Sequence, residues 1–340
     1  MGAVLTAVLT GCSMIDEDLS NCEEQEQEQA RLDYELRLVT NLTTELETEL
    51  SAQTDVDISN ALRQFLRNIF TDHAHDVDLS FYDTQGDSLR LQHDQHIMDA
   101  SQASYTLNLP KREYMHLAVA NVLDNQLVDL FDDNRCHTSN LSLTGKDTIP
   151  SHTTGLFTAR QPMNVLEGVS QQFNVRLYMA NCAAALIVDT QGHDASRLQV
   201  YSTGFASGFS ICDSVYRHAS KSPIVRTTRL DPERGSKIGF CSVTFPSRRF
   251  ATSRTVIEDA DRFKMPAGQL PLWEFRAYIT NADGKVTETI LGINEPLQPG
   301  ELKIIQVRLK DDGSLTTESS EVSVSVTLDW KKGDIYTPVI

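Results

Sequence analysis

The feature that most constrains the fold is an alternation of apolar and polar residues with a period of two, which recurs along the sequence. The first clear case alternates apolar with charged residues: Leu32, Tyr34, Leu36 and Leu38 against Asp33, Glu35 and Arg37. The last is a run in which Val322, Val324 and Val326 alternate with serines. Successive side chains of a β-strand point to opposite faces, so the pattern predicts strands with one buried face. The chain is expected to be mainly β.

Further strands are predicted wherever this alternation, or a short apolar run, lies between turn residues. They cover residues 77–81, 89–91, 105–109, 114–122, 126–131, 175–188, 237–245, 273–280, 286–293, 302–309 and 313–316. The turns at Asn281–Gly284 and Asp311–Gly313 predict hairpins, because an Asp-Gly pair tolerates positive φ. Short strands joined by regular turns indicate β-sandwiches.

One segment has helical spacing instead. Its apolar residues recur every three or four positions: Ile58, Leu62, Phe65, Leu66, Ile69 and Phe70. Ser59 is the predicted N-cap, because its hydroxyl can accept a hydrogen bond from an amide of the first turn. We expect one helix here, in the N-terminal domain and lying across a sheet.

The chain has 340 residues, a length at which two domains are the first expectation. A polar stretch with glycine and proline, residues 132–155, is predicted to link a domain at 31–150 to a second at 151–340. No stretch after the N-terminus approaches the roughly 18 apolar residues of a membrane helix. The formal charge of −17 argues against a nucleic-acid partner, which needs clustered Lys and Arg facing its phosphates.

The N-terminus carries a different pattern. Small residues lead to a cysteine in Leu9-Thr10-Gly11-Cys12, as a lipoprotein signal peptidase requires, although residues 1–11 contain no Lys or Arg. On this hypothesis residues 1–12 are a signal segment that ends at Cys12, the new N-terminus and the site of lipidation (palmitate). The alternative is a chance Gly-Cys pair. Residues 13–30 are acidic and low in complexity, and they are expected to form a flexible tether.

Six cysteines allow several pairings. If Cys12 is acylated, five remain and at least one cannot pair within the chain. A bridge between Cys22 and Cys136 would join the two ends of the first domain, and export would allow it to persist. Cys182 lies in an apolar run and is expected to be a small buried hydrophobic residue. Cys212 and Cys241 either pair across strands or stay free.

The sequence contains few candidate catalytic or metal-binding motifs. The serine of Gly204–Gly208 comes one residue late for a nucleophile elbow, and no HExxH or CxxC motif occurs. His73 and His75, with His93 and His96 further along, are residues that can bind zinc or copper. Histidines on an exposed loop are more often only solvated. We therefore predict no catalytic residue, no metal and no cofactor, and an enzyme is not expected.

Several motifs resemble, in their order, those of a known family. They are the Cys12-to-Cys22 block with its Asp-Glu-Asp-Leu-Ser sequence, the hairpin at 77–86, Tyr114–Asn121, Gly155–Phe157, residues 173–188 and Leu328–Trp330. The family is that of the FimB/Mfa2 fimbrial anchor lipoproteins of the Bacteroidales. The resemblance spans essentially the whole chain.

This resemblance implies two tandem transthyretin-like Greek-key β-sandwiches, lipidation of Cys12 and display on the surface of the outer membrane. It implies a subunit that attaches fimbriae (pili) to the membrane and limits the length of the fibre, without catalysis. The acidic residues Asp16, Glu17 and Asp18, just after the lipid site, resemble the surface-export signal of these bacteria.

An anchor also needs an edge strand for the fimbrial stalk subunit (pilin), because strand addition pairs a row of backbone N–H and C=O groups at once. The C-terminal strand, with Val322, Val324 and Val326, is the predicted contact; the alternative is an internal strand of the second sandwich. A rival function is a surface glycan- or nutrient-binding lipoprotein, which exposed aromatic residues would favour. Trp273 and Trp330, however, are both expected in the core.

Overall fold

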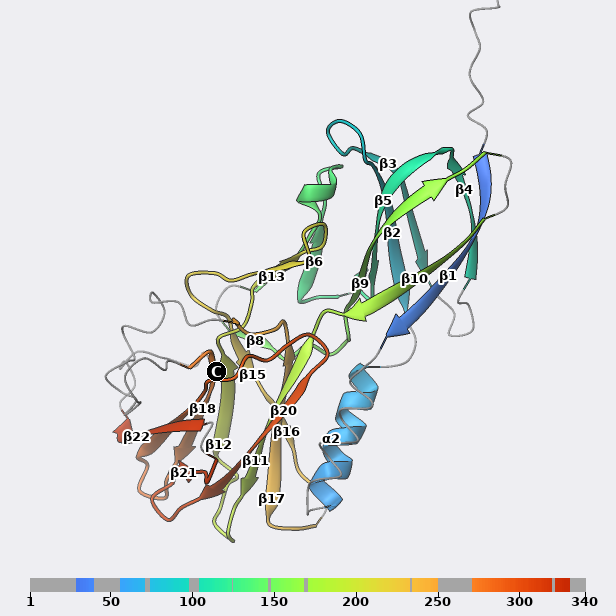
Figure 1. The fold of residues 1–340 in the computed structure, drawn as a ribbon. Coiled ribbons are helices and arrows are strands. Elements are labelled where there is room, and N and C mark those ends of the chain that lie inside the picture. Colours follow the sequence, from blue (N-terminus) through green and yellow to red (C-terminus); the bar gives the residue numbers. More distant parts are fainter. Residues whose placement is uncertain are drawn as a thin grey trace, which may run out of the picture.

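The computed structural model describes residues 29–39, 56–70, 74–97, 104–123, 125–145, 148–167, 171–232, 234–249, 271–319 and 322–330. They form four β-sheets and one α-helix along an elongated molecule (Figure 1). The prediction of a mainly β chain is confirmed.

A seven-stranded sheet forms the upper part of the molecule in Figure 1. Its strands follow the order β3 (Arg90–Ile97), β2 (Asp76–Asp83), β5 (Arg112–Ala120), β9 (Phe157–Val165), β10 (Gln171–Met179), β1 (Gln29–Val39) and β4 (Ser104–Pro110). β9 and β10 pair at only two positions, Thr158 with Tyr178 and Phe157 with Met179. The two halves of the sheet therefore diverge, and apolar side chains of both halves meet in one core.

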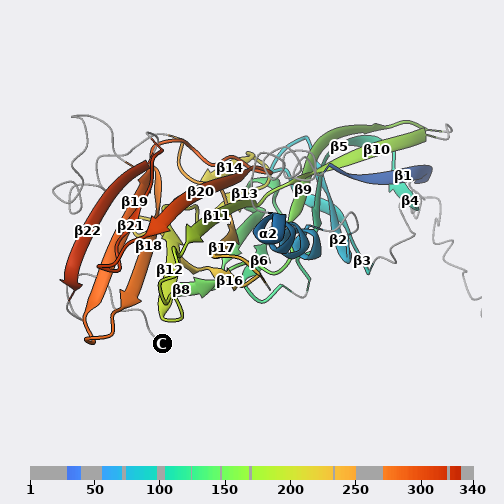
Figure 2. The ribbon, with the colours of Figure 1, turned by 90° about the horizontal axis from the view of Figure 1, so that it is seen from below.

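The lower part is a second sandwich, made of two sheets that share a core (Figure 2). The five-stranded sheet has the order β16 (Thr228–Leu230), β17 (Lys237–Thr244), β11 (Cys182–Asp189), β20 (Leu302–Leu309) and β21 (Leu315–Thr316). The six-stranded sheet has the order β22 (Val322–Trp330), β19 (Val286–Ile293), β18 (Trp273–Thr280), β12 (Leu198–Thr203), β15 (Ile224–Arg226) and β8 (Thr148–Pro150). Trp273 is buried in this core, as expected.

Strand β11 is apolar on both faces because both faces are covered. Leu186 and Val188 point into the core between the two sheets, while Ala183 and Ala185 face the helix. The prediction of a central strand covered on two sides is thus confirmed for this part of residues 175–188.

Helix α2 (Val56–Ile69) lies across the five-stranded sheet, so that helix and two sheets form successive layers (Figure 2). It comes from the N-terminal part of the sequence but covers a sheet of the second sandwich, where Leu62 and Leu66 are buried. The prediction that Ser59 caps the helix is wrong, because the helix begins three residues earlier and encloses it. The helix can approach the sheet closely because residue 239 is a glycine. An added Cβ at Gly239 would lie 2.9 Å from Cδ1 of Ile58.

A small four-stranded sheet lies between the two larger parts (Figure 1), in the order β14 (Val215–Arg217), β13 (Gly208–Ser210), β7 (Asn140–Leu143) and β6 (Val128–Phe131). Just before β7 comes a short 3₁₀ turn, η2 (Cys136–Thr138). The predicted linker at 132–155 is therefore structured: β7 and β8 arise from it, and both pair with strands from later in the sequence.

The strand pairing also bears on the domain boundary. β9 and β10 complete the first sheet although they follow residue 150. We propose that the two larger parts are separate domains and that the boundary lies near Ala180, where β10 ends, rather than at 150.

Candidate functional site

Strand β22 occupies an edge of the six-stranded sheet (Figure 2). It pairs with β19 from Val322, opposite Ile293, to Trp330, opposite Val286. Among the described strands, none pairs with its outer side. β22 is thus part of the second sandwich and also one of its edges, so its outer backbone groups can receive another strand.

The apolar face of β22 extends beyond the core that it covers. Val322 is buried and Val324 packs against the core, whereas Val326, on the same face, is 42% exposed. Leu328, where the register with β19 shifts, is 57% exposed. The opposing sheet ends here in the two-residue strand β21, whose Leu315 N–H donates to Oγ1 of Thr289, the residue opposite Val326. This short strand leaves part of the longer β22 uncovered.

A second open edge belongs to β20. This strand pairs with β11 over residues 302–308 but with β21 only at Arg308 and Leu309. Over residues 302–307 the other side of β20 therefore faces none of the strands in the described part of the chain. Because β21 packs beside β19 and β22, both open edges lie on the same side of the sandwich.

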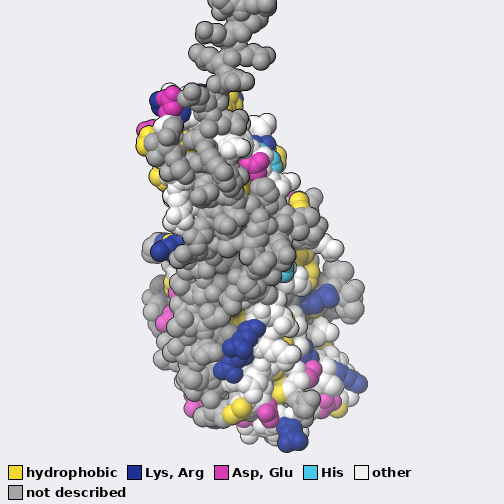
Figure 3. Space-filling view, turned by 90° about the vertical axis from the view of Figure 1, so that its right-hand side faces the viewer, with side chains coloured by type: hydrophobic (Ala, Val, Ile, Leu, Met, Phe, Trp, Pro, Cys, Tyr) yellow, Lys and Arg dark blue, Asp and Glu magenta, His cyan; other side chains and the backbone are white. Residues whose placement is uncertain are grey.

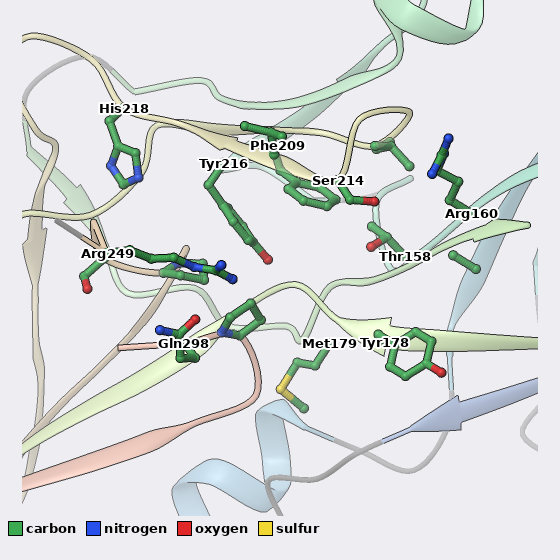
Figure 4. Close-up of a pocket in the computed structure, with 16 residues that line it drawn as sticks. Thr158, Arg160, Tyr178, Met179, Phe209, Ser214, Tyr216, His218, Arg249 and Gln298 are labelled. Carbon is green, nitrogen blue, oxygen red and sulfur yellow. The ribbon is translucent and has the colours of Figure 1, made fainter. Parts of the chain in front are cut away.

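A pocket of about 620 Å³ lies where the first sheet, the small sheet and loops of the second sandwich meet (Figure 4). Arg160 and Tyr178 lie toward one end of it, and His218 and Arg249 toward the other (Figure 4). Its wall includes Tyr216, whose hydroxyl donates to the carbonyl of Ala180 at 2.9 Å.

The charge of this pocket is opposite to that of the chain. Its lining contains two arginines and one histidine but no Asp or Glu, in a protein of formal charge −17. Burial, helped by the nearby Arg248 charge, lowers the pKa of His218 to about 4, so its imidazole is neutral at pH 7. The two exposed guanidinium groups of Arg160 and Arg249 then supply the positive charge.

The predicted N-terminal site residues fall outside the described part of the chain. These are Cys12, Asp16, Glu17, Asp18 and Cys22. The lipid site, the export signal and the Cys22–Cys136 bridge remain predictions.

The remaining cysteines occupy three different apolar clusters. Cys182 is fully buried in the core of the second sandwich, as predicted. Cys241 is buried near the helix, while Cys136 and Cys212 share the cluster of the small sheet. The structure therefore separates Cys212 from Cys241, which the sequence had left as one possible pair.

The described histidines do not form a metal site. His93 Nε2 lies 2.6 Å from Oδ2 of Asp78, while His73 and the His96 side chain fall outside the described part. Among the described residues, no group of three or more His, Cys, Asp or Glu could hold a metal ion. Basic, acidic and apolar side chains are also interspersed over the described surface of the face shown in Figure 3. No described helix has the length and apolar character needed to cross a membrane.

Comparison with known families decides the identity. The model of the fimbrillin-A associated anchor proteins Mfa1 and Mfa2 matches residues 66–335. The chain belongs to this family. As a member of the Mfa2 family it is a protein of the fimbrium, associated with fimbrial subunits at the cell surface.

Solved structures with TM-scores above 0.5 share the fold, at low sequence identity. A candidate adhesin from Bacteroides ovatus is 11% identical, with a TM-score of 0.53 over 90% of this chain and 97% of its own. A candidate polysaccharide-binding protein from Bacteroides thetaiotaomicron is 12% identical, with a TM-score of 0.52 over 88% and 96%. The fimbrial anchor protein Mfa2 from Porphyromonas gingivalis is 10% identical, with a TM-score of 0.45 over 88% and 99%. No curated protein matches the sequence.

Sequence reasoning missed the pocket between the sheets. Its walls come from segments more than 100 residues apart, such as Thr158 and Pro299, and neither arginine stands in a motif. Tertiary contacts bring these segments together: Gly300 N–H donates to the carbonyl of Asn181, and Ala180 N–H donates to the carbonyl of Leu156, just before β9.

Proposed function

We propose that this member of the Mfa2 family is a lipid-tethered subunit that anchors fimbriae to the outer membrane and limits the length of the fibre. The observation that carries the proposal is the edge strand β22, in a chain whose family is that of fimbrial anchors. The role is structural, without catalysis or a cofactor.

Strand addition at β22 supplies the contact with the pilin. A strand added to an edge makes a ladder of main-chain hydrogen bonds, and its alternate side chains fill pockets on the receiving sheet. Val326 and Leu328 offer an apolar surface for such side chains, next to the open edge of β20. An incoming strand therefore gains hydrogen bonds and apolar burial together.

The N-terminal lipid on Cys12 supplies the attachment to the membrane. Acyl chains contribute about 0.8 kcal/mol per buried methylene, so more than one chain is needed for lasting attachment. The acidic residues Asp16, Glu17 and Asp18 would direct export to the surface. The predicted tether at 13–30, shortened to 13–28 because Gln29 and Ala30 belong to β1, would hold the sandwiches away from the bilayer. A subunit fixed in this way ends the fibre, because it occupies the position that the next pilin would take.

The test is a deletion strain that is complemented with native or altered protein. Deletion is expected to leave fimbriae that are made but shed into the medium, and longer than normal. The native gene restores short, cell-bound fimbriae. Cell-bound fimbriae of normal length in the deletion strain would refute the anchor role.

A second candidate, the surface glycan-binding lipoprotein, is favoured by the pocket. Sugars stack on aromatic rings, and Tyr178 at the rim is 56% exposed. The two arginines and the lack of acidic lining suit a saccharide that carries carboxylates. Calorimetry with oligogalacturonate, and with neutral oligosaccharide as control, tests it. Binding that Arg160→Ala and Arg249→Ala weaken at least tenfold would support this function; heat signals unchanged by both variants would exclude the pocket.

A further inference from the structure

The small four-stranded sheet holds two cysteines close together. Cys136 is the first residue of η2, just before β7, and is 3% exposed. Cys212 comes two residues after β13, the strand that pairs with β7. Both side chains pack in the same apolar cluster, where Cys136 is buried and Cys212 is partly buried.

The backbone fixes the two segments to each other. Ser139 N–H donates to the carbonyl of Cys136 at 3.1 Å, and Ile211 N–H donates to the carbonyl of Ser139 at 3.1 Å. The residue that precedes Cys212 is thus bonded to the turn that Cys136 begins. Burial raises the pKa of the Cys136 thiol, and the neighbouring thiol of Cys212 adds to this effect, as expected for two thiols close together in one cluster.

We propose that Cys136 and Cys212 form a disulfide in the exported protein, in place of a Cys22–Cys136 bridge. The proposal rests on the proposed function, because export is what brings the thiols to an oxidising compartment. Side chains already in contact need little backbone movement to reach disulfide geometry.

The oxidant is a disulfide-bearing molecule, either a thiol oxidoreductase or glutathione disulfide. Cys212 is the more exposed of the two, so its thiolate attacks one sulfur of the oxidant and forms a mixed disulfide, and the first thiol leaves. The thiolate of Cys136 then attacks Cys212 Sγ and the second thiol leaves. Two protein thiols are oxidised to one disulfide, and the oxidant takes up both electrons and both protons as a dithiol or as two thiols.

The bond would stabilise a sheet made of short strands. The strands of the small sheet have only three or four residues each, and its segments come from distant parts of the chain. Cross-linking removes conformational freedom from the unfolded chain, and more so when the closed loop is long. The same sheet carries Phe209 and Tyr216 of the pocket wall, so the bond would also hold that wall in place.

Tryptic peptides identify the pairing directly. Cys136 lies on the peptide 136–146 and Cys212 on 198–217, whereas Cys182 and Cys241 lie on 177–197 and 238–248. The full-length protein is recovered from the native cell surface, alkylated without reduction and digested. A second sample is first reduced and then oxidised with glutathione disulfide.

The expected product in both samples is 136–146 linked to 198–217. If the linked pair is found only in the sample oxidised with glutathione disulfide, the pairing is supported but an oxidising location of the native protein is not. A link from 136–146 to the peptide that ends at Arg31, or free Cys136 and Cys212 in both samples, would overturn the proposal.

Melting temperatures separate the bond from packing. Reduction of the native protein is expected to lower its melting temperature by roughly 5–15 °C. Cys136→Ala and Cys212→Ala should each abolish this response to reduction, while the control Cys241→Ala should keep it, because Cys241 is buried in a different cluster. If reduction lowers the melting temperature of Cys212→Ala as much as that of the native protein, the bond is refuted.

Discussion

Asn181 and His152 form a fully buried polar pair, with Nδ2 of Asn181 2.8 Å from Nδ1 of His152. Oδ1 of Asn181 accepts the N–H of Leu156 at 2.5 Å, and its carbonyl accepts the N–H of Gly300 at 2.7 Å. Asn181 lies between β10 and β11, where the chain leaves the first sheet for the second sandwich. The side chain of Asn181 therefore holds the segment 152–156, and its main-chain carbonyl holds the loop at Gly300, at the junction of the two larger parts.

Loss of the Asn181 amide should destabilise the protein strongly. Asn181→Leu keeps the branched shape at Cγ but leaves the N–H of Leu156 and the imidazole of His152 buried without their partner, and each such group costs about 1–3 kcal/mol. We expect the free energy of unfolding to fall by about 2–5 kcal/mol, measured by urea denaturation. Asn174→Leu, at an exposed position of β10, is the comparison; an equal loss of unfolding free energy in both variants would show that the buried bonds of Asn181 do not account for the effect.

The buried histidines predict a pH dependence of stability. Burial lowers the pKa of both His116 and His152 from 6.5 to about 4. Between these values the unfolded chain binds protons that the folded protein does not, so the stabilisation is complete above pH 6.5 and is lost as the pH falls toward 4. Each imidazole accounts for about 3 kcal/mol over this window.

Urea denaturation at pH 7.5, 6, 5 and 4.5 measures this window. His152→Gln and His116→Gln should each flatten the fall in unfolding free energy, whereas His137→Gln, at an exposed residue, should keep it. If the unfolding free energy of both buried-site variants falls as steeply with pH as that of the native protein, the pH dependence belongs to carboxyl groups instead.

Much of the fold follows from the sequence because its strongest pattern is local. The alternation at 32–38, the helical spacing at 58–70 and the Asp-Gly turns all predict elements that the structure contains. Gly284 and Gly313 have φ of +81° and +79°, which is the reason that these turns need glycine.

What could not be predicted depends on contacts between distant segments. The stretch at 132–155 is polar and looks like a linker, but its short strands gain their partners from residues 208–210 and 224–226. In the same way, the amphipathic pattern of α2 indicates that one face of the helix is buried, but it does not indicate which sheet covers that face. The edge position of β22 likewise depends on the strand order, which residue alternation does not encode.

The approach of α2 to its sheet should depend on Gly239. An added Cβ would lie 2.9 Å from Cδ1 of Ile58 and 3.3 Å from Cβ of Leu230, so Gly239→Ala forces the helix or these side chains to move. We expect a loss of about 1–3 kcal/mol in unfolding free energy. Ile58→Val removes the nearer atom, so a double-mutant cycle should recover part of the loss; strict additivity would contradict direct contact.

Replacement of the proposed lipid site should release a folded protein. Cys12→Ala removes the acyl chains but leaves both sandwiches intact, since Cys12 precedes every described residue. The variant should appear in the soluble fraction with an unchanged melting temperature, and its fimbriae should be shed. Cys182→Ala, at a cysteine buried in the core, is the control that should stay on the membrane. Retention of Cys12→Ala after a high-salt wash would refute lipidation at this site.

A pair of proline substitutions can separate assembly from folding on β22. In an antiparallel strand successive residues direct their N–H groups alternately to the two neighbours, so Ser325 and Val326 point to opposite sides. One N–H belongs to the ladder with β19 and the other to the open edge. Proline lacks this donor. One of the two variants, Ser325→Pro or Val326→Pro, should therefore destabilise the sandwich. The other should leave the melting temperature nearly unchanged and weaken pilin binding.

The exposed side chains provide the matched control. Val326→Ala and Leu328→Ala remove apolar contacts but no backbone donor, so each should weaken pilin binding less than the edge-facing proline does. Binding of purified pilin is measured by surface plasmon resonance, beside circular dichroism melts of each variant. If the proline that preserves the fold also preserves full affinity, the pilin does not add to this edge, and the open edge of β20 becomes the next place to look, because it lies on the same side of the sandwich.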